Sequence, residues 1–371
     1  MSAVRTEGEG NFTSAAHAFA AVHADRATDT LITNVRAHTA AIRTEVGPLP
    51  VSVHDGLAGD AWVCSPTSTY ADYAAEEAAR YLPPWAAPLS RKGIAAIGVP
   101  LRSNGLDRAV CVNNWLLSTN LYPSLAQVNP VAVVAEAIER WPQHAVWFRS
   151  LNAHDNADWI DALRAAGCVL VASRQVYLYD AFETLHRRHQ NLRWDIALLR
   201  KTPLRHCDDA DINEIDYARI AELYAMLYIG KHSRFNPVYT AEFLRLWHRA
   251  GLLQFEGFRD EDNRLACIVG LFRLGRTATA PIVGYDTTEP QKRALYRLAT
   301  ACAYRTCQIQ GWRLNFSAGA AGFKRLRGGV PSIEYSAVYA GHLPRRTRAM
   351  ISALSATTCR LGVPLLRGFQ L

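Results

Sequence analysis

The chain has 371 residues, of which 49% are hydrophobic and 20% are charged, and its formal net charge is +8. This length favours two domains, and this composition excludes a disordered chain, because enough apolar side chains are present to bury a core. No run of about 18 consecutive apolar residues occurs, and the N-terminus carries Glu7 and Glu9 in place of a basic and apolar leader. We therefore expect no membrane span, no secretory signal and a cytoplasmic location.

The positive charge comes almost entirely from arginine, since the chain has only five lysines. The planar arginine fork binds phosphate through two parallel hydrogen bonds, so the charge is compatible with coenzyme A, a nucleotide or tRNA. A solvated basic surface is the alternative. The eight cysteines are scattered and form no C-x-x-C motif, which indicates reduced, buried thiols, and we expect no metal site.

The first 183 residues divide into a leader and a folded segment. Residues 1–45 lack a regular apolar pattern and are expected to be loosely ordered, so the N-terminal domain is placed at 46–183. Asn104-Gly105 is a hairpin signal within this domain. Apolar periodicity predicts helices over 70–81, 130–141 and 157–166. Short apolar runs predict strands over 61–64, 93–100, 108–113, 145–148, 169–172 and 176–179.

A connector over 184–210 is rich in arginine and histidine, and it leads to a C-terminal domain at 211–345 and a tail at 346–371. The patterns of the second domain predict two helices, a three-stranded meander, a long helix and two further strands. The helices are expected over 216–229, 240–250 and 291–310, and the strands over 253–258, 265–274, 277–285, 313–316 and 332–339.

This order of elements resembles the GNAT acyltransferase fold. The resemblance implies that the sheet splits between the strand before the long helix and the strand after it, and that the acyl donor lies in this gap. GNAT enzymes hold the coenzyme A pyrophosphate in an R/Q-x-x-G-x-G/A turn at the start of that helix, where free N–H groups bind phosphate. Here the turn reads Gln291-Lys292-Arg293-Ala294-Leu295-Tyr296, so both glycine positions are replaced.

The segment from Asn315 to Gly329 contains a Phe-Lys pair after a loop of small residues, and this pattern resembles the FemABX family. That family has two GNAT-like domains and transfers amino acids from aminoacyl-tRNA to an amine. The resemblance implies that Phe323 packs near the terminal adenosine of the donor and that Lys324 stabilises the oxyanion. The chain lacks the inserted coiled-coil arm of the cell-wall enzymes, which favours a small-molecule amine as the acceptor.

Other polar residues follow predicted strands and are weaker candidates for the site, each with a turn, cap or surface role as its alternative. Asp286 is a candidate to accept a proton from, or to orient, the incoming ammonium group. Candidates for binding the donor are Gln291, Asn315, Ser317, Arg325 and Arg327. Candidates for binding the acceptor are Tyr285, Lys231, Asn236, Asn114, Arg149 and Arg174.

Together these patterns predict an α/β (α+β) protein with two tandem GNAT-like domains, each a mixed, mostly antiparallel sheet flanked by helices. The predicted activity is an acyltransferase that forms an amide bond on an amine, with aminoacyl-tRNA favoured narrowly as the donor. An acetyl-coenzyme A-dependent N-acetyltransferase is the alternative, and a non-catalytic RNA- or ligand-binding protein is a further one. No tightly bound cofactor is expected.

Overall fold

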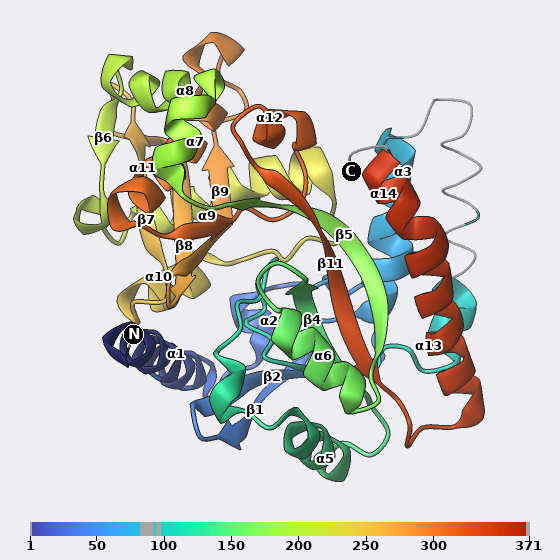
Figure 1. Ribbon diagram of the computed structural model, residues 1–371. Helices are drawn as coiled ribbons and strands as arrows, with labels where there is room; N and C mark the ends of the chain where they lie inside the picture. Colours follow the sequence, from blue (N-terminus) through green and yellow to red (C-terminus); the bar gives the residue numbers. More distant parts are fainter. Residues whose placement is uncertain (1, 82–92, 94–97, 369–371) are drawn as a thin grey trace. The chain divides into compact units, whose positions relative to one another are not determined.

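The computed structural model describes residues 2–81, 93 and 98–368, and the chain folds into two compact units (Figure 1). Unit 1 consists of residues 1–22, 176–234 and 238–331. Unit 2 consists of residues 23–175, 235–237 and 332–371. Each unit is a mixed α/β structure whose sheet is mostly antiparallel and carries helices, as the sequence predicts.

The sheet of unit 1 has the strand order β5-β10-β9-β8-β7-β6. Its strands are β6 (Arg205–Cys207), β7 (Gln254–Arg259), β8 (Leu265–Leu274), β9 (Thr277–Tyr285), β10 (Arg313–Asn315) and the last residues of β5 (Val169–Tyr179). Neighbouring strands from β6 to β9 are antiparallel, because short turns join β7 to β8 and β8 to β9. Asn263 and Gly275 adopt positive φ in these turns, at +62° and +57°.

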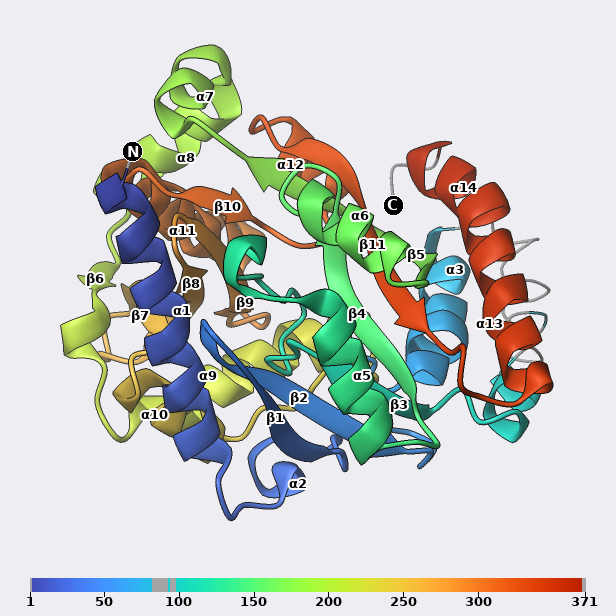
Figure 2. The same ribbon diagram turned by 60° about the horizontal axis from the view of Figure 1, so that its bottom comes forward.

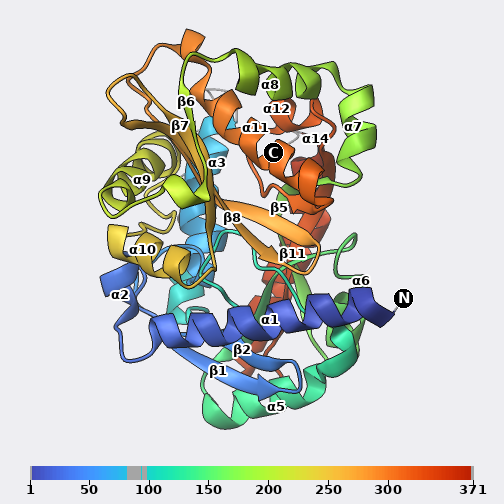
Figure 3. The ribbon, with the colours of Figure 1, turned by 90° about the vertical axis from the view of Figure 1, so that its left-hand side faces the viewer.

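Helices cover both faces of this sheet, and Figure 3 shows α9 and α11 on opposite sides of it. Gly284 of β9 is required for close packing, because a Cβ there would lie 2.7 Å from the backbone of Leu223 in α9. The helices of unit 1 include α1 (Ser2–His23, to residue 22), α7 (Phe182–Arg188), α8 (Gln190–Lys201), α9 (Asp216–Ala225), the turn η4 (Met226–His232), α10 (Ala241–Arg249), α11 (Leu295–Gln310) and α12 (Ala321–Arg325).

The sheet of unit 2 has the strand order β1-β2-β3-β4-β11-β5. Its strands are β1 (His38–Thr44), β2 (Gly47–Asp55), β3 (Arg108–Val112), β4 (Ala145–Asn152), β11 (Val330–Tyr339) and the first part of β5. Its helical segments include α2 (Thr28–Leu31), η1 (Ser68–Tyr73), α3 (Ala74–Tyr81), η2 (Leu125–Gln127), α5 (Pro130–Arg140), α6 (Ala157–Ala165), α13 (Arg345–Thr357), η6 (Thr358–Gly362) and α14 (Val363–Gly368).

The division of the chain differs from the predicted boundaries of 46–183 and 211–345. The strand β11, expected in the C-terminal domain, pairs with β4 in unit 2, where Tyr335 lies opposite Leu151. The end of β5, expected in the N-terminal domain, pairs with β10 in unit 1, where Tyr179 lies opposite Leu314. Pairing between strands so distant in the chain leaves no local signal in the sequence, so the exchange was not predicted.

Several predicted elements are also corrected. Residues 1–45, expected to be a loose leader, contain the helices α1 and α2 and most of the strand β1. Residues 62–64 form a turn instead of a strand. Residues 98–103 are helical, so the expected hairpin at Asn104-Gly105 is the end of a helix, where Gly105 N–H donates to Arg102 O; the rest of the expected strand at 93–100 falls largely outside the described residues.

The run of α13, η6 and α14 forms one extended helical stretch (Figure 2). Within the described residues, Arg345–Gly368 is long and apolar enough to span a membrane, and 11% of its most apolar window is buried. Its sequence has no long continuous apolar run, because serine, threonine and arginine residues interrupt it. Ile351 is buried in the core of unit 2, so this helix also packs on the protein.

Candidate functional site

The parallel strands β9 and β10 part after a short stretch of pairing. They are paired over Thr277–Thr279 and Arg313–Asn315, after which β9 runs on to Tyr285 while β10 ends. The chain beyond β10 bonds to β5 instead, since Phe316 N donates to Tyr177 O and Tyr177 N donates to Ser317 O. The predicted split of the sheet on either side of the long helix is therefore present.

Lys324 is buried beside the loop that follows β10. Lys324 is only 4% exposed. Its Nζ donates to the carbonyls of Phe316 at 2.6 Å, Ser317 at 3.2 Å and Ala318 at 2.7 Å. An ammonium group has three N–H donors, so these carbonyls account for all of them. The ammonium group of Lys324 is therefore enclosed by the loop, and its protons hold that loop in this structure.

The loop itself is bent by residues in the left-handed region. Ser317, Gly319 and Ala320 have φ values of +56°, +79° and +51°. The side chain of Asn315 stabilises the bend, because its Oδ1 accepts a hydrogen bond from Ser317 N at 3.1 Å. The candidates Asn315 and Ser317 therefore lie in this bend and are hydrogen-bonded to each other.

The two candidate arginines after Lys324 have different environments. Arg327 is buried, pairs with Asp195, donates to Phe323 O at 2.8 Å and lies with its guanidinium carbon 3.4 Å from the centre of the Phe323 ring. Asp195 also pairs with Arg297, so the two arginines share one carboxylate, and the buried position of Arg327 favours a structural role over binding donor phosphates. Arg325 is only partly exposed, and its Nε is buried without a partner among the described residues. Its guanidinium carbon lies 5.9 Å from the Tyr177 ring.

A row of aromatic rings lies where β9 ends and α11 begins. The ring of Tyr296 is 5.9 Å from that of Tyr285 and 5.0 Å from that of Phe323. Lys231 reaches the same row, since its Nζ donates to Tyr285 Oη at 2.9 Å. The structure thus brings together Lys231, Tyr285 and Phe323, which the sequence placed in one site, and adds Tyr296, which was considered only as a replaced glycine.

The start of α11 has no side-chain cap. Ala294 precedes the helix at a φ of +53°, and no acidic residue stands in the first turn. The candidate Gln291 is exposed in the short helical turn η5 (Gln291–Arg293), where its carbonyl accepts from Ala294 N at 3.0 Å. The helix N-terminus is thus present, while the aromatic ring of Tyr296 stands at the second glycine position.

Asp286 is held as a carboxylate in unit 1. Burial alone would raise its pKa, but hydrogen bonds from Thr288 and Arg219 and the charge of Arg219 outweigh burial and lower the pKa to about 2. Its Oδ2 lies 2.5 Å from Arg219 Nη2, and its Oδ1 accepts from the Thr288 amide and hydroxyl. A carboxylate with such a low pKa is a poor proton acceptor, so these contacts favour the alternative role of a turn cap and ion-pair partner over that of a base.

The remaining candidates gather around Trp62 in unit 2. The guanidinium carbons of Arg149 and Arg174 lie 5.0 Å and 4.7 Å from the centre of its ring. Asn114 Oδ1 accepts from Arg149 Nη1 at 3.0 Å, and Asn236 Oδ1 accepts from Trp62 Nε1 at 3.0 Å. Asn236 belongs to unit 2, whereas Lys231, predicted to lie beside it, belongs to unit 1.

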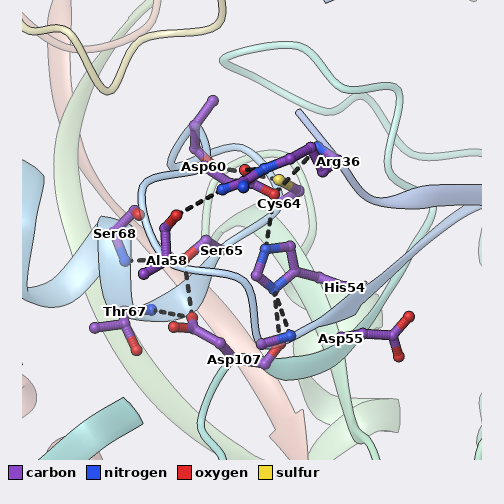
Figure 4. Close-up of polar contacts among 12 residues, drawn as sticks. Arg36, His54, Asp55, Ala58, Asp60, Cys64, Ser65, Thr67, Ser68 and Asp107 are labelled. Carbon is purple, nitrogen blue, oxygen red and sulfur yellow. Dashed lines mark hydrogen bonds and ion pairs between the residues drawn. The ribbon is translucent and has the colours of Figure 1, made fainter. Parts of the chain in front are cut away.

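Two groups of potential metal ligands occur among the described residues, His54 with Asp60 and Cys64, and His206 with Glu256 and Cys302. In the first group, His54 Nε2 lies 2.9 Å from Asp60 Oδ2 and Nδ1 lies 2.8 Å from Asp107 O (Figure 4). Arginines already pair with both carboxylates, Arg36 with Asp60 and Arg305 with Glu256, so a metal ion would compete with a guanidinium for each.

Comparisons with known proteins give fold likeness only. No protein-family model and no curated protein matches the chain. Among solved structures, L-PGS from Bacillus licheniformis is 11% identical, with 66% of this chain and 82% of that chain covered and a TM-score of 0.46. FemX is 9% identical, covering 60% and 78%, with a TM-score of 0.45. A tandem GNAT protein from the clavulanic acid biosynthesis pathway is 12% identical, covering 62% and 75%, with a TM-score of 0.37. At these values the likeness assigns no activity to this chain.

Proposed function

We propose that this protein is an acyltransferase that forms an amide bond on an amine, and that the reaction takes place where β9 and β10 part in unit 1. The observation that carries this proposal is the end of their parallel pairing at Thr279 and Asn315. Ligands of open α/β sheets bind where neighbouring strands separate, at their carboxyl ends. Lys324, Arg325 and the aromatic row all lie on segments that follow these two strands or pack against those segments.

In the proposed reaction the neutral amine nitrogen attacks the carbonyl carbon of an activated ester or thioester. The carbon–nitrogen bond forms, the bond to the leaving oxygen or sulfur breaks, and the amine proton passes to the leaving atom. Negative charge develops on the carbonyl oxygen in between, and a fixed cation or donor nearby lowers this barrier. Asp286 takes no part as a base in this scheme, because its pKa of about 2 disfavours protonation.

Lys324 has two roles in the proposal. Its bonds to Phe316 O and Ala318 O fix the loop after β10, and the longest of its bonds, 3.2 Å to Ser317 O, is the one it exchanges for the donor's carbonyl oxygen. The alternative role is purely structural, and the same three bonds support it. A non-catalytic RNA- or ligand-binding protein would follow from that alternative.

The choice of donor rests on the start of α11. Tyr296 fills the second glycine position with a ring packed on Tyr285 and Phe323, which disfavours a close approach by a pyrophosphate. This feature and the net charge of +8 favour an aminoacyl-tRNA donor. Its phosphates could bind Arg325, whose Nε has no hydrogen-bond partner among the described residues. Acetyl-coenzyme A remains the second candidate, since the helix N-terminus carries no side-chain cap and no acidic residue in its first turn.

The proposal is tested by incubating the protein with an amine mixture and either charged tRNA or acetyl-coenzyme A, followed by mass spectrometry of the products. We expect an amide product with one donor, and a loss of about 100-fold or more for Lys324→Met. Lys324→Arg, which keeps the cation, controls for the fold, and Lys201→Met changes an exposed lysine of the same unit. Full activity of a folded Lys324→Met, or no consumption of either donor, would contradict the proposal.

A small-molecule amine as the acceptor and a cytoplasmic location belong to the same proposal. The acceptor is identified by the mass of the product in the same experiment. Four residues that were predicted to bind this acceptor lie around Trp62 in unit 2, namely Asn114, Arg149, Arg174 and Asn236.

A further inference from the structure

Unit 2 contains a second place where parallel strands part. The strands β3 and β4 are paired from Ala109 with Ala145 to Val112 with Phe148, after which β3 ends and β4 continues. Asn114 and Arg149 follow directly beyond the last pair. Both residues lie where the two parallel strands part, and open sheets place ligands at such points.

Arg149 lies at this point, and one nitrogen of its guanidinium group, Nη1, donates hydrogen bonds to the protein. The residue is 6% exposed, and its Nη1 donates to Val63 O at 2.8 Å and to Asn114 Oδ1 at 3.0 Å. Its Nε and Nη2 have no acceptor among the described residues. These two atoms form one edge of the guanidinium, and their parallel N–H groups match the two oxygens of a carboxylate.

The charges around Arg149 do not balance. Arg174 is paired with Glu334, with Nε and Oε1 2.8 Å apart, and Glu334 is buried. The side chain of Tyr70 and the thiol of Cys111 interact with Arg149, but burial raises the pKa of both, that of Cys111 to about 11, so both are neutral at pH 7. Among Arg149, Arg174 and Glu334, two guanidinium groups and one carboxylate leave one buried positive charge, and such a charge is costly unless another group neutralises it.

The backbone at this edge is held in unusual conformations. Asn113, Leu116 and Ser150 have positive φ values of +52°, +57° and +65°, which residues with a Cβ rarely adopt. Ser150 Oγ is buried and has no hydrogen-bond partner in the part of the chain that the structure describes. Strained residues and unsatisfied buried polar groups gather at binding sites, where the surrounding structure maintains them for function.

Trp62 provides a rigid wall beside the two arginines. Its Nε1 donates to Asn236 Oδ1 at 3.0 Å, which fixes the ring, and both guanidinium groups lie against it. The carbonyl that Arg149 binds belongs to the next residue, Val63. A ligand at the free edge of Arg149 would therefore change the surroundings of the Trp62 indole, and tryptophan fluorescence can report its binding.

We propose that unit 2 holds a binding site for the carboxylate of a small organic acid, with the Nε–Nη2 edge of Arg149 as its main contact. This inference does not depend on acyl transfer in unit 1. An amine-bearing acid, such as an amino acid, would be a suitable acceptor if both proposals hold. The site would serve equally as a ligand sensor if unit 1 has no catalytic activity.

The site is tested with the full chain in a buffer free of carboxylate and phosphate. Sodium acetate, glycine and inorganic phosphate are titrated at constant ionic strength, with sodium chloride as the reference, and thermal unfolding and tryptophan fluorescence are recorded. We expect a carboxylate to raise the melting temperature by about 5 °C at 100 times its dissociation constant. The fluorescence change should be absent from Trp62→Phe.

Variants of Arg149 decide whether this residue is the contact. Arg149→Met should lose the carboxylate response, and Arg149→Lys, which keeps the charge without the fork, should bind at least about tenfold more weakly. Arg140→Met, at a half-exposed arginine of the same unit, should respond as the wild type does. The proposal is overturned if the wild type responds to no carboxylate, if phosphate alone is bound, or if Arg149→Lys binds a carboxylate as tightly as the wild type.

Discussion

Asp195 in α8 and Arg327 beyond α12 form a buried ion pair, in which Arg327 Nε donates to Asp195 Oδ2. The other oxygen of the same carboxylate accepts from Arg297 Nε in α11 at 2.7 Å. Asp195 therefore connects the long helix and the Phe323–Arg327 segment to α8. Because Arg327 also stacks on Phe323, this carboxylate fixes one end of the aromatic row at the candidate site.

We expect Asp195→Asn to lower the free energy of unfolding by about 3–5 kcal/mol, because it leaves Arg327 buried without a counter-charge. Denaturation in urea measures this change. Asp180→Asn is a matched control in the same unit, since the Asp180–Arg313 pair is partly exposed, and it should cost less than about 1 kcal/mol. Equal losses for the two variants would show that burial does not determine the strength of the Asp195 pair.

The His54–Asp60 pair in unit 2 predicts a loss of stability at alkaline pH. Burial alone would lower the pKa of His54, but hydrogen bonds to Asp60 and to the Asp107 carbonyl, with the charges of both aspartates, raise it. Arg36 pairs with Asp60 from the other side. A raised pKa in the folded state means that the contribution of His54 is fully present below pH 6.5 and is lost as the pH rises through the folded-state value.

We therefore expect the free energy of unfolding to fall between pH 6 and pH 9 by more in the wild type than in His54→Gln, which does not titrate. His38→Gln changes an exposed histidine of the same unit and should keep the dependence of the wild type. Urea denaturation at several pH values measures both. A wild-type profile that His54→Gln leaves unchanged would mean that His54 is not protonated in the folded protein.

The sequence predicted the elements of this fold better than it predicted their pairing. The helix over 130–141 and the strands over 265–274 and 277–285 are confirmed within one or two residues, because apolar periodicity and glycine turns mark them. The strand exchange of β5 and β11 was missed, since hydrogen bonds between distant segments have no local pattern. The strands β1 and β2 were also missed, because residues 1–45 show no regular apolar pattern and prolines stand at 48 and 50, inside β2.

The residues of the candidate site were likewise predicted better than the contacts between them. Residue types and positions after strands led to Arg149 and Arg174, which the structure places against one indole ring. The sequence did not indicate that Trp62 is that ring, since it was assigned to a strand. It also gave Arg325 and Arg327 the same role, and only the position of Asp195, more than a hundred residues earlier in the chain, distinguishes them. Charge partners are set by tertiary packing.

Asp286 predicts a loss of stability in acid. Its pKa of about 2 lies below the ordinary value of 3.8, so its contribution is fully present above pH 3.8 and is lost as the pH falls towards 2. Asp286→Asn should lower the free energy of unfolding at pH 7 by about 1–2 kcal/mol and reduce the acid dependence. Asp262→Asn, at an exposed aspartate of the same unit, is the control. An unchanged acid profile for Asp286→Asn would contradict the assigned ion pair with Arg219.

The start of α11 allows the two donor hypotheses to be separated by gain of function. If the Tyr296 ring closes the phosphate position, then Ala294→Gly with Tyr296→Gly restores both glycines of the coenzyme A turn and exposes the helix N–H groups. Ala294→Gly alone should be neutral or stabilise slightly, because Ala294 already has a φ of +53° and the left-handed region costs a residue with a Cβ roughly 1–2 kcal/mol. Isothermal titration with coenzyme A should detect binding at least about tenfold tighter in the double variant than in the wild type. Wild-type binding that is already tight, and that the double variant does not improve, would show that Tyr296 does not obstruct the turn and would favour acetyl-coenzyme A over aminoacyl-tRNA.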